Sequence, residues 1–288
     1  MKQTGIRIWH PAVSGCYFAA VLAFSAMVMH PAYLLVSLCG ATWNLRVLSG
    51  GKSTWRAWRT ALPLFILTAL INAAFNHRGM TILWYFPSGN PLTLESLFYG
   101  AAAGALLVCV LLWMRCLTLV FTTDRWLYLF GAVMPTLALL LSMSLRFVGL
   151  FVRRFRTVQS AQAGLQTAKP KGRLRTAFSA FPIMLNWSLE SAVTTADSMK
   201  SRGYATARRT AMRQYRFTGR DRLLLCWILL CLFSLVSAAA GGLLRFGYFP
   251  VPHLPAANVR SVYFILLYFL LCLTPVLAGR GKGRLWTC

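Results

Sequence analysis

The chain has 288 residues, of which 58% are hydrophobic, and it carries 30 Lys and Arg against 5 Asp and Glu. Charged residues make up 12% of the sequence, about half of the share of roughly 25% that is usual in soluble domains. This balance is typical of a protein whose apolar surface lies in lipid and whose cations face headgroups or an acidic partner. A nucleic-acid partner is disfavoured because long apolar segments interrupt the basic residues. We therefore expect an all-α integral membrane protein.

The N-terminus does not resemble a cleaved signal peptide. Lys2 and Arg7 precede an apolar run over 13–38, but no small-residue cleavage site leads into a soluble domain. The eight Cys are scattered through apolar runs without a CxxC pair or a Cys/His metal spacing, and the four His also lack ligand spacing. We expect no disulfide framework, no metal site, no cofactor and no catalytic residue.

Six apolar runs approach the length of about 20 residues that a membrane-spanning helix needs. Pro31 separates the first two, which predicts a tight hairpin. The predicted fold has about six transmembrane helices plus long cytoplasmic helices. Its three parts are 1–121 with about four spans, 122–222 with the cytoplasmic module, and 223–288 with a final helix pair. The six predicted spans cover 13–29, 31–45, 61–76, 95–115, 223–241 and 261–278.

The distribution of basic residues predicts which loops are cytoplasmic, because basic loops stay on that side of the membrane. The segment 146–222 holds 16 Lys and Arg against 3 acids, and the loop 46–59 and the tail after 278 are also basic. The loop 77–94 contains a single Arg and is expected to be external. Both termini are then predicted to be cytoplasmic.

The apolar run 127–145 is long enough to span, but a full crossing there would place the sixteen cations of 146–222 outside the membrane. We therefore interpret 127–145 as an interfacial or protein-covered helix on the cytoplasmic side. An ordinary span remains the alternative.

The cytoplasmic segment is predicted to form two helices. Pro170, Gly172 and Pro182 predict a hinge over 166–182, with the second helix starting near Pro182. That helix would run to Gly203, about 33 Å at 1.5 Å per residue. Each helix has a stripe at helical spacing: Phe147, Phe151, Phe155, Val158 and Gln162 in the first, and the mostly small Leu185, Leu189, Ala192, Ala196, Met199 and Gly203 in the second.

Two short motifs need interpretation. SGGKST at 49–54 has the end of a phosphate-binding loop, but the required first Gly is replaced by Arg46, so we expect a cytoplasmic turn and no ATP site. SMKSRGYATARR at 198–209 has an Arg-Gly step at the end of a long polar helix. Its cations either form a solvated positive surface or include an Arg that projects into an acidic groove of another protein.

Three blocks of sequence resemble the transmembrane T component (EcfT/CbiQ family) of energy-coupling factor (ECF) ABC transporters. With the apolar spans, the similarity covers nearly the whole chain, and the last block is the most specific, because it resembles the Ala-Arg-Gly signature of the family. The blocks are NPLTLESLFYG at 90–100, FTTDRWLYLFGAVMPTLALLLSMSLRF at 121–147 and WSLESAVTTADSMKSRGYATARRT at 187–210.

The resemblance implies two signatures at the ends of two cytoplasmic coupling helices, which dock into grooves of two ABC ATPase subunits of the EcfA type. The second signature falls on Ser201, Arg202 and Gly203, where Ser replaces the usual Ala. The first falls on Gln162, Ala163 and Gly164, where Ala replaces the expected Arg, so that dock would depend on shape or on a neighbour. The supporting coupling-helix residues are Arg156, Glu190, Asp197 and Met199.

The resemblance also implies a function. A T component is a non-catalytic scaffold that transmits ATP-driven motion to a membrane-embedded substrate-binding S component, which delivers a vitamin or a metal ion inward across the bacterial cell membrane. Two alternatives from other classes stay open, a membrane-embedded enzyme and a self-contained secondary carrier. The former needs a cluster of acids, His or Cys, and the latter needs inverted repeats or buried ionisable residues.

Overall fold

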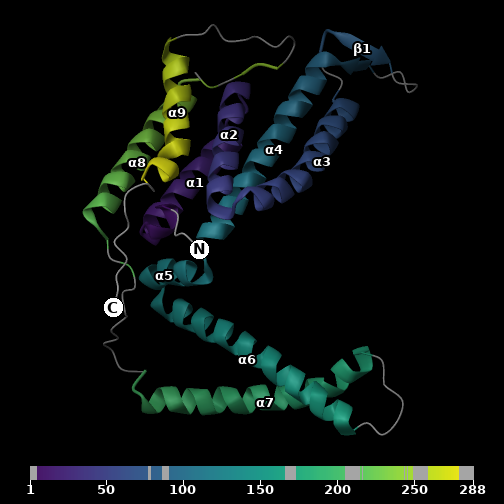
Figure 1. Cartoon of the computed structure of the whole chain (residues 1–288), viewed down its shortest axis with the longest axis vertical. Helices are drawn as coiled ribbons and strands as arrows, with labels where there is room; N and C mark the ends of the chain where they lie inside the picture. Colours follow the sequence, from purple (N-terminus) through teal and green to yellow (C-terminus); the bar gives the residue numbers. More distant parts are fainter. Residues whose placement is uncertain are drawn as a thin grey trace. The chain divides into compact units, whose positions relative to one another are not determined.

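The computed structural model describes residues 5–76, 79–85, 91–165, 173–204, 215, 217–242, 244, 246–248 and 259–278. Nearly all of these residues are helical, and one small antiparallel sheet pairs two short strands (Figure 1). The elements in chain order are the 3-10 helix η1 (Gly5–Ile8), α1 (Pro11–Met27), α2 (Pro31–Ser49), α3 (Gly51–Phe75), β1 (Ile82–Tyr85), β2 (Pro91–Thr93), α4 (Leu94–Val120), α5 (Thr123–Val133), α6 (Pro135–Leu165), α7 (Arg173–Ser201), α8 (Gly219–Ala240) and α9 (Val259–Ala278).

Five of the described helices are long and apolar enough to cross a membrane, namely α3, α4, α6, α8 and α9. The apolar α1 has 17 residues and is about 25 Å long, which is shorter than a hydrocarbon core of about 30 Å. The α2 helix has 19 residues, but polar side chains such as Asn44 lower its hydropathy. The architecture is that of an all-α integral membrane protein with several membrane-spanning helices.

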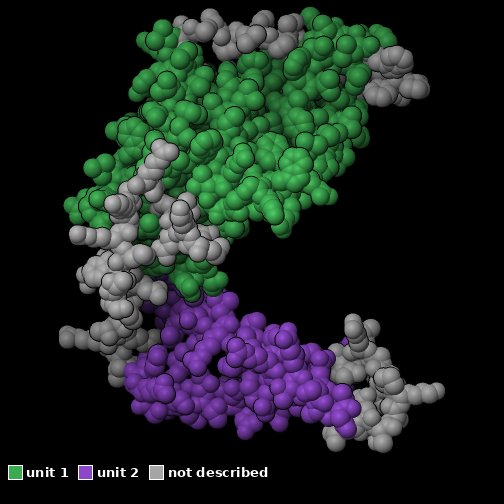
Figure 2. Space-filling view, in the orientation of Figure 1, with its two compact units in different colours: residues 1–125, 215–288 green, residues 126–214 purple. Residues whose placement is uncertain are grey.

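The chain divides into two compact units, drawn in different colours in Figure 2. Unit 1 combines residues 1–125 with 215–288, so the N-terminal and C-terminal helices share one core. Unit 2 contains residues 126–214 and includes α6 and α7. The sequence predicts three consecutive parts, whereas the compact units join the first part to the last.

The core of unit 1 is built around aromatic side chains of α1 and α4. Trp113 and Tyr17 are fully buried, and Phe18 is 1% exposed. The rings of Tyr17 and Phe18 both meet the ring of Trp113 edge-on, with centroids 6.2 and 6.4 Å apart. This T-shaped geometry is the one that aromatic quadrupoles favour, so the three rings pack α1 against α4 in one arrangement.

Small residues allow the helices of unit 1 to approach one another closely. A side chain on Gly100 or Gly104 of α4 would lie within 3 Å of the carbonyl oxygens of Ala69 and Phe65 in α3. A side chain on Gly40 of α2 would similarly lie 2.8 Å from Cβ of Cys272 in α9. Such close approach is the usual basis of helix association in membranes.

A ring of hydrogen bonds joins three helices inside this core. Tyr268 Oη of α9 donates to Ser37 Oγ of α2 at 3.1 Å, and Ser25 Oγ of α1 lies 2.9 Å from Tyr268 Oη and 3.1 Å from Ser37 Oγ. Trp113 Nε1 of α4 also donates to Ser37 Oγ, at 3.0 Å. If Ser37 donates to Ser25 and Ser25 donates to Tyr268, both lone pairs and the single proton of Ser37 are used. The polar groups are therefore satisfied without water.

A second polar link connects α2 to α9 near this ring. Asn44 Nδ2 donates to the carbonyl oxygens of Gly40 at 2.8 Å and Cys272 at 3.0 Å. Tyr17 Oη of α1 donates to the same Cys272 oxygen at 3.4 Å. The carbonyl of Cys272 is thus bound by side chains from two other helices.

The helices α1 and α2 begin with the same cap, in which a His precedes a Pro. The Pro at the first helical position has no N–H, so the next residue carries the first unpaired donor. Nδ1 of His10 accepts from Ala12 N at 3.3 Å, and Nδ1 of His30 accepts from Ala32 N at 3.2 Å. Burial lowers the pKa of both imidazoles, which keeps them in the neutral form that can accept.

Asp221 joins the N-terminus of α8 to the start of α1. Its Oδ2 atom accepts from Thr218 N at 3.1 Å and from Thr218 Oγ1 at 2.7 Å, while its Oδ1 atom accepts from His10 N at 3.4 Å. The Asp221 carboxylate opposes the effect of burial by raising the pKa of His10. This contact connects two segments that are more than 200 residues apart in sequence.

The predicted end of the second span at residue 45 and the predicted start of the third at residue 61 are both wrong. The predicted loop 46–59 is mostly helical, because α2 continues to Ser49 and α3 starts at Gly51. Only Gly50 separates the two helices, and its φ of 80° favours glycine. The expected turn within SGGKST is therefore present, but it consists of one residue.

The sequence predicts one helix over the apolar run 127–145, but the structure has two. The α5 helix ends at Val133 and α6 begins at Pro135, with Met134 outside both. A residue before proline is disfavoured in the helical region, which explains a break at this position. Because α6 is long and apolar enough to cross a membrane, the interfacial position of 127–145 stays a prediction.

The second of the two helices predicted within 146–222 also begins earlier than predicted. The α7 helix starts at Arg173 and passes through Pro182, where the sequence predicts the start. A proline inside a helix removes one N–H donor, and its ring crowds the carbonyl of the residue four positions earlier. Contacts of Ser179 and Trp187 with α6 support α7 on both sides of Pro182. The remaining part of the predicted hinge, 166–172, lies outside the described residues.

Candidate functional site

The end of α7 is a Schellman motif built around Gly203. Tyr204 N donates to Met199 O at 3.1 Å, and Gly203 N donates to Lys200 O at 3.1 Å. The φ angle of Gly203 is 73°, a left-handed conformation that favours glycine. The Arg-Gly step therefore stops α7 as the sequence predicts, and it satisfies carbonyl groups that a frayed end would leave exposed.

The motif places two side chains of the second signature in solvent. Ser201 and Arg202 are exposed, and Gly203 is half-buried. Ser201 Oγ donates to Ser198 O at 2.9 Å within its own helix, and the backbone N of Arg202 donates to the same oxygen at 3.3 Å. Because the backbone at Arg202 is held on both sides, the exposed side chain extends from a Cα atom whose position is defined.

The first signature has a different local structure. Gln162, Ala163 and Gly164 lie in the last turn of α6, which continues to Leu165. Gly164 has no left-handed φ, and a Cβ on it would meet no atom within 4 Å. The two signatures are therefore not equivalent, because the first has no glycine turn and no basic side chain.

Gln162 contacts α7 instead of pointing away from the helical pair. Its Nε2 atom donates to Ser179 O at 3.3 Å, and its Oε1 atom accepts from Ser179 Oγ at 3.0 Å. Both polar ends of the amide are thus engaged by one residue of the neighbouring helix. This pair of hydrogen bonds connects the end of α6 to α7, and Ala163 and Gly164 remain exposed beside it.

A second contact between α6 and α7 is aromatic and cationic. Phe147 of α6 stacks on Trp187 of α7 with centroids 5.6 Å apart and an interplanar angle of 18°. The guanidinium carbon of Arg154 lies 5.7 Å from the centroid of the Trp187 ring, which is within cation–π range. Ala180 and Met184 are buried between this contact and the Gln162 contact along α7. The two helices are therefore held together at two separate positions.

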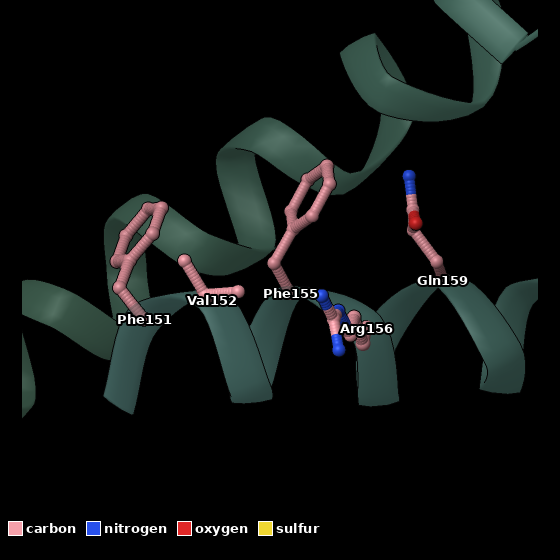
Figure 3. Close-up of a pocket in the computed structure, with 5 residues that line it drawn as sticks. All are labelled: Phe151, Val152, Phe155, Arg156 and Gln159. Atoms are coloured by element: carbon pink, nitrogen blue, oxygen red, sulfur yellow. The ribbon is translucent and has the colours of Figure 1, made fainter. Parts of the chain in front are cut away.

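A shallow groove of about 380 Å³ follows one face of α6. It is lined by Phe151, Val152, Phe155, Arg156 and Gln159, and Figure 3 shows the two Phe rings and the Gln amide on one side of the helix. The Phe side chains belong to the stripe that the sequence predicts. Arg156, one of the predicted supporting residues, is exposed and places a positive charge beside this apolar groove.

The other predicted supporting residues lie on α7. Glu190 and Asp197 are exposed and Met199 is half-buried, with its carbonyl oxygen in the Schellman motif. Leu185 and Leu189 of the predicted stripe are 48% and 59% exposed. Four residues of the small-residue stripe are therefore not covered by α6, namely Leu185, Leu189, Ala192 and Ala196.

The sequence did not reveal the residues that bind α6 to α7. Because the sequence predicts that the second helix begins near Pro182, it places Ser179 and Ala180 in the hinge. The spacing of Ala180, Met184 and Trp187 is helical, and it would have predicted the buried face had the helix been extended across the proline. The pairing of Gln162 with Ser179 has no signal in a single sequence.

The five acidic residues all lie in described parts of the chain, and none is an unpaired carboxylate inside a membrane span. Glu95 and Asp221 are buried in the first turns of α4 and α8, but their carboxylates bind the backbone N–H groups of Thr81 and Thr218. Asp124, Glu190 and Asp197 are exposed. Within the described ranges, no group of three or more His, Cys, Asp or Glu has the geometry to hold a metal ion.

The fold and the exposed helix end together define the class of the molecule, a multi-pass helical membrane protein with an additional basic helical unit. Comparison with protein-family models finds no match for this chain. No curated protein matches it either.

Proposed function

We propose that this protein is the transmembrane energy-coupling subunit of an ECF-type ABC importer. In this role it binds two ATPase subunits through the ends of α6 and α7, and it transmits their ATP-driven motion to an S component. The substrate is a vitamin or a metal ion, and the ATPase partners perform the catalysis. The protein is located in the bacterial cell membrane with both termini in the cytoplasm.

The observation that carries this proposal is the end of α7. A 29-residue helix ends in a glycine turn, immediately after an exposed Arg whose backbone is held by hydrogen bonds. A solvated positive surface needs charge alone and no defined turn, whereas docking into a partner's groove needs a side chain at a fixed position. The build of this helix end therefore supports docking over simple solvation.

Features of unit 1 support a scaffold over a carrier. Proton-driven carriers use ionisable residues inside the membrane, but the buried carboxylates of Glu95 and Asp221, each in the first turn of its own helix, bind the backbone N–H groups of Thr81 and Thr218. Ser37 and Asn44, two polar side chains in the core, bind partners from neighbouring helices. This arrangement is suited to holding helices together.

The two contacts between α6 and α7 support transmission of motion. The Phe147–Trp187–Arg154 contact and the Gln162–Ser179 contact hold the two helices at separate points. A force applied at the end of α7 would then move both helices as one body. Docking at the first signature would use its exposed Ala163 and Gly164, together with the nearby Arg156, since Gln162 is engaged by α7.

The proposal is tested by isolating the tagged full-length chain from its native membrane and measuring which ATPase subunits accompany it. We expect Arg202→Glu to lose these subunits while membrane insertion and yield are retained. Reversal of a charge that is buried at an interface costs about 2–5 kcal/mol, or roughly 30-fold or more in Kd. Lys200→Glu is the matched control, because it makes the same charge change two residues away on the exposed surface.

A gain of affinity provides a second arm. Ala163→Arg introduces the basic residue that the family signature carries at this position, on an exposed site at the end of α6. We expect it to increase the retention of ATPase subunits in mild detergent. The proposal fails if no ATPase accompanies the wild-type chain, or if Arg202→Glu and Lys200→Glu retain the subunits equally.

A further inference from the structure

The two strands β1 and β2 form a hairpin between α3 and α4, and the described part of this hairpin is unusually apolar. Residues 79–85 and 91–93 include no charged side chain. Met80 is 71% exposed, and Ile82, Leu83 and Tyr85 are 48%, 52% and 60% exposed. Because both faces of β1 are exposed, neither the rest of unit 1 nor β2 covers these side chains.

The position of the hairpin relative to the membrane follows from the length of α3. Its first turns carry the exposed cations Lys52, Arg56 and Arg59, which belong in the headgroup region. From there, residues 60–75 form an apolar stretch of 16 residues, or about 24 Å. This is roughly 6 Å shorter than the hydrocarbon core of about 30 Å.

The neighbouring α4 gives a second measure of the same distance. From Leu94 to the residue before the exposed Arg115 there are 21 residues, or about 32 Å. Ser96 Oγ donates to Asn72 O at 3.3 Å, so the end of α3 and the start of α4 lie at the same level. The two lengths bracket the thickness of the core, so the hairpin begins at the far boundary or slightly below it.

Several polar groups of the hairpin are paired within the protein, which suits a position in the membrane interface. The strands pair in an antiparallel register that joins Tyr85 to Pro91, and Leu94 N donates to Thr81 O at 3.0 Å. Thr81 N donates to Glu95 Oε1 at 3.2 Å, and Thr81 Oγ1 donates to the same oxygen at 2.7 Å. The carboxylate is 1% exposed and compensates donors that water would otherwise bind.

The outer parts of α3 and α4 continue the apolar surface of the hairpin. Phe75 is 82% exposed and Phe98 is 56% exposed, and Leu70 and Ile71 of α3 are also about half exposed. Exposed apolar side chains are therefore present both on the spans and on β1; Arg78, which stands between α3 and β1 in the sequence, lies outside the described residues.

We infer that the β1–β2 hairpin is a lipid-binding element, which lies in the membrane interface opposite the basic end of α3. Its occupant is phospholipid: the acyl region covers Ile82 and Leu83, and the Tyr85 ring lies at headgroup level, as aromatic side chains do at interfaces. The apolar stretch of α3 is shorter than the hydrocarbon core, and the hairpin adds apolar surface at its end. Without the hairpin, the bilayer would have to become thinner around α3. This inference does not rest on the coupling function.

The test uses the full-length chain in phospholipid vesicles, with an environment-sensitive fluorophore on a single cysteine. Leu83→Cys is labelled in a parent chain in which the exposed Cys16, Cys39 and Cys226, together with Cys288, are replaced by Ala. Quenching is measured with nitroxide-labelled phospholipid and separately with aqueous iodide present on both sides of the vesicle membrane. The matched controls are Leu67→Cys on the lipid-facing side of α3 and Gly51→Cys at its basic end, where a side chain has open space.

We expect the Leu83 label to be quenched by the nitroxide lipid nearly as strongly as the Leu67 label. Its iodide quenching constant should be at least about threefold smaller than that of the Gly51 label, since interfacial burial of 5–10 Å excludes the ion. A second label at Met80→Cys must give the same result, which guards against a local effect of one substitution. The inference is overturned if both hairpin labels are quenched by iodide like the Gly51 label and escape the nitroxide lipid, because the hairpin would then face water or require a protein partner.

Discussion

Replacement of Ser37 by Ala tests the hydrogen-bonded ring in the core of unit 1. The substitution leaves the Ser25–Tyr268 contact of 2.9 Å in place, but it removes the acceptor of Trp113 Nε1–H. Trp113 is fully buried, so its N–H cannot turn to water. A buried donor left without a partner costs about 1–3 kcal/mol. We expect Ser37→Ala to lower the free energy of unfolding by about 2 kcal/mol, within this range.

The loss can be measured with the chain's own buried thiols. Cys109, Cys116, Cys231 and Cys272 are buried and become reactive to a fluorogenic maleimide as the protein unfolds. A loss of about 2 kcal/mol corresponds to a decrease of roughly 4–8 °C in Tm for a chain larger than 150 residues. Ser49→Ala is the matched control in the same helix. The Ser49 hydroxyl donates only to Leu45 O, and this carbonyl keeps its backbone hydrogen bond within the helix when the hydroxyl is removed.

A double-mutant cycle with Trp113→Phe then isolates the contribution of the pair. Hydrogen bonds between membrane helices average about 0.6 kcal/mol in such cycles and reach about 1.7 kcal/mol. We expect a coupling energy between these values, since the contact is buried and its distance is 3.0 Å. Equal melting temperatures for Ser37→Ala and Ser49→Ala, or a coupling energy near zero, would refute the reasoning.

Two further predictions concern helix starts and helix contacts. Burial lowers the pKa of His30 below its usual 6.5, so the stability from its cap is complete above pH 6.5 and is lost as the pH falls through the folded pKa; the rings of Tyr33 and Phe246 face the imidazole. His30→Asn should keep the cap and reduce the loss of Tm between pH 7.5 and pH 5. An unchanged pH profile would contradict this cap. Gly40→Ala should destabilise the protein by about 1–2 kcal/mol, because its Cβ would lie 2.8 Å from Cβ of Cys272 and overpacking outweighs the gain in helix propensity. The control is Gly149→Ala on α6, which has open space and should be neutral or stabilising in the same thermal assay. A stabilising Gly40→Ala would mean that α2 and α9 are less closely packed.

Much of the fold could be predicted from hydropathy and charge. Apolar length alone is sufficient for spans such as α4 and α8, because a chain in lipid must satisfy its backbone within each helix. The glycine stop at Gly203 was also predictable, since a left-handed residue at a helix end is nearly always glycine.

Other features depended on tertiary contacts that a single sequence does not reveal. The passage of α7 through Pro182 relies on its contacts with α6, so the local rule for proline gave a start nine residues too late. The division of 127–145 at Met134 follows from Pro135, but the long apolar run obscured it. The engagement of Gln162 by Ser179 could not be anticipated, because it depends on the crossing of α6 and α7.

The joining of the two ends of the chain in unit 1 has a consequence for biogenesis. Ser25, Ser37 and Asn44 enter the membrane early during synthesis, but their partners Tyr268 and the carbonyl of Cys272 are made more than 220 residues later. Between these events the whole of unit 2 is translated. The first helices are therefore in the bilayer with incomplete polar contacts during this time, and the core is complete only after α9 has been inserted. A chain that stops before α9 leaves the side chains of Ser25, Ser37 and Asn44 without their partners on that helix.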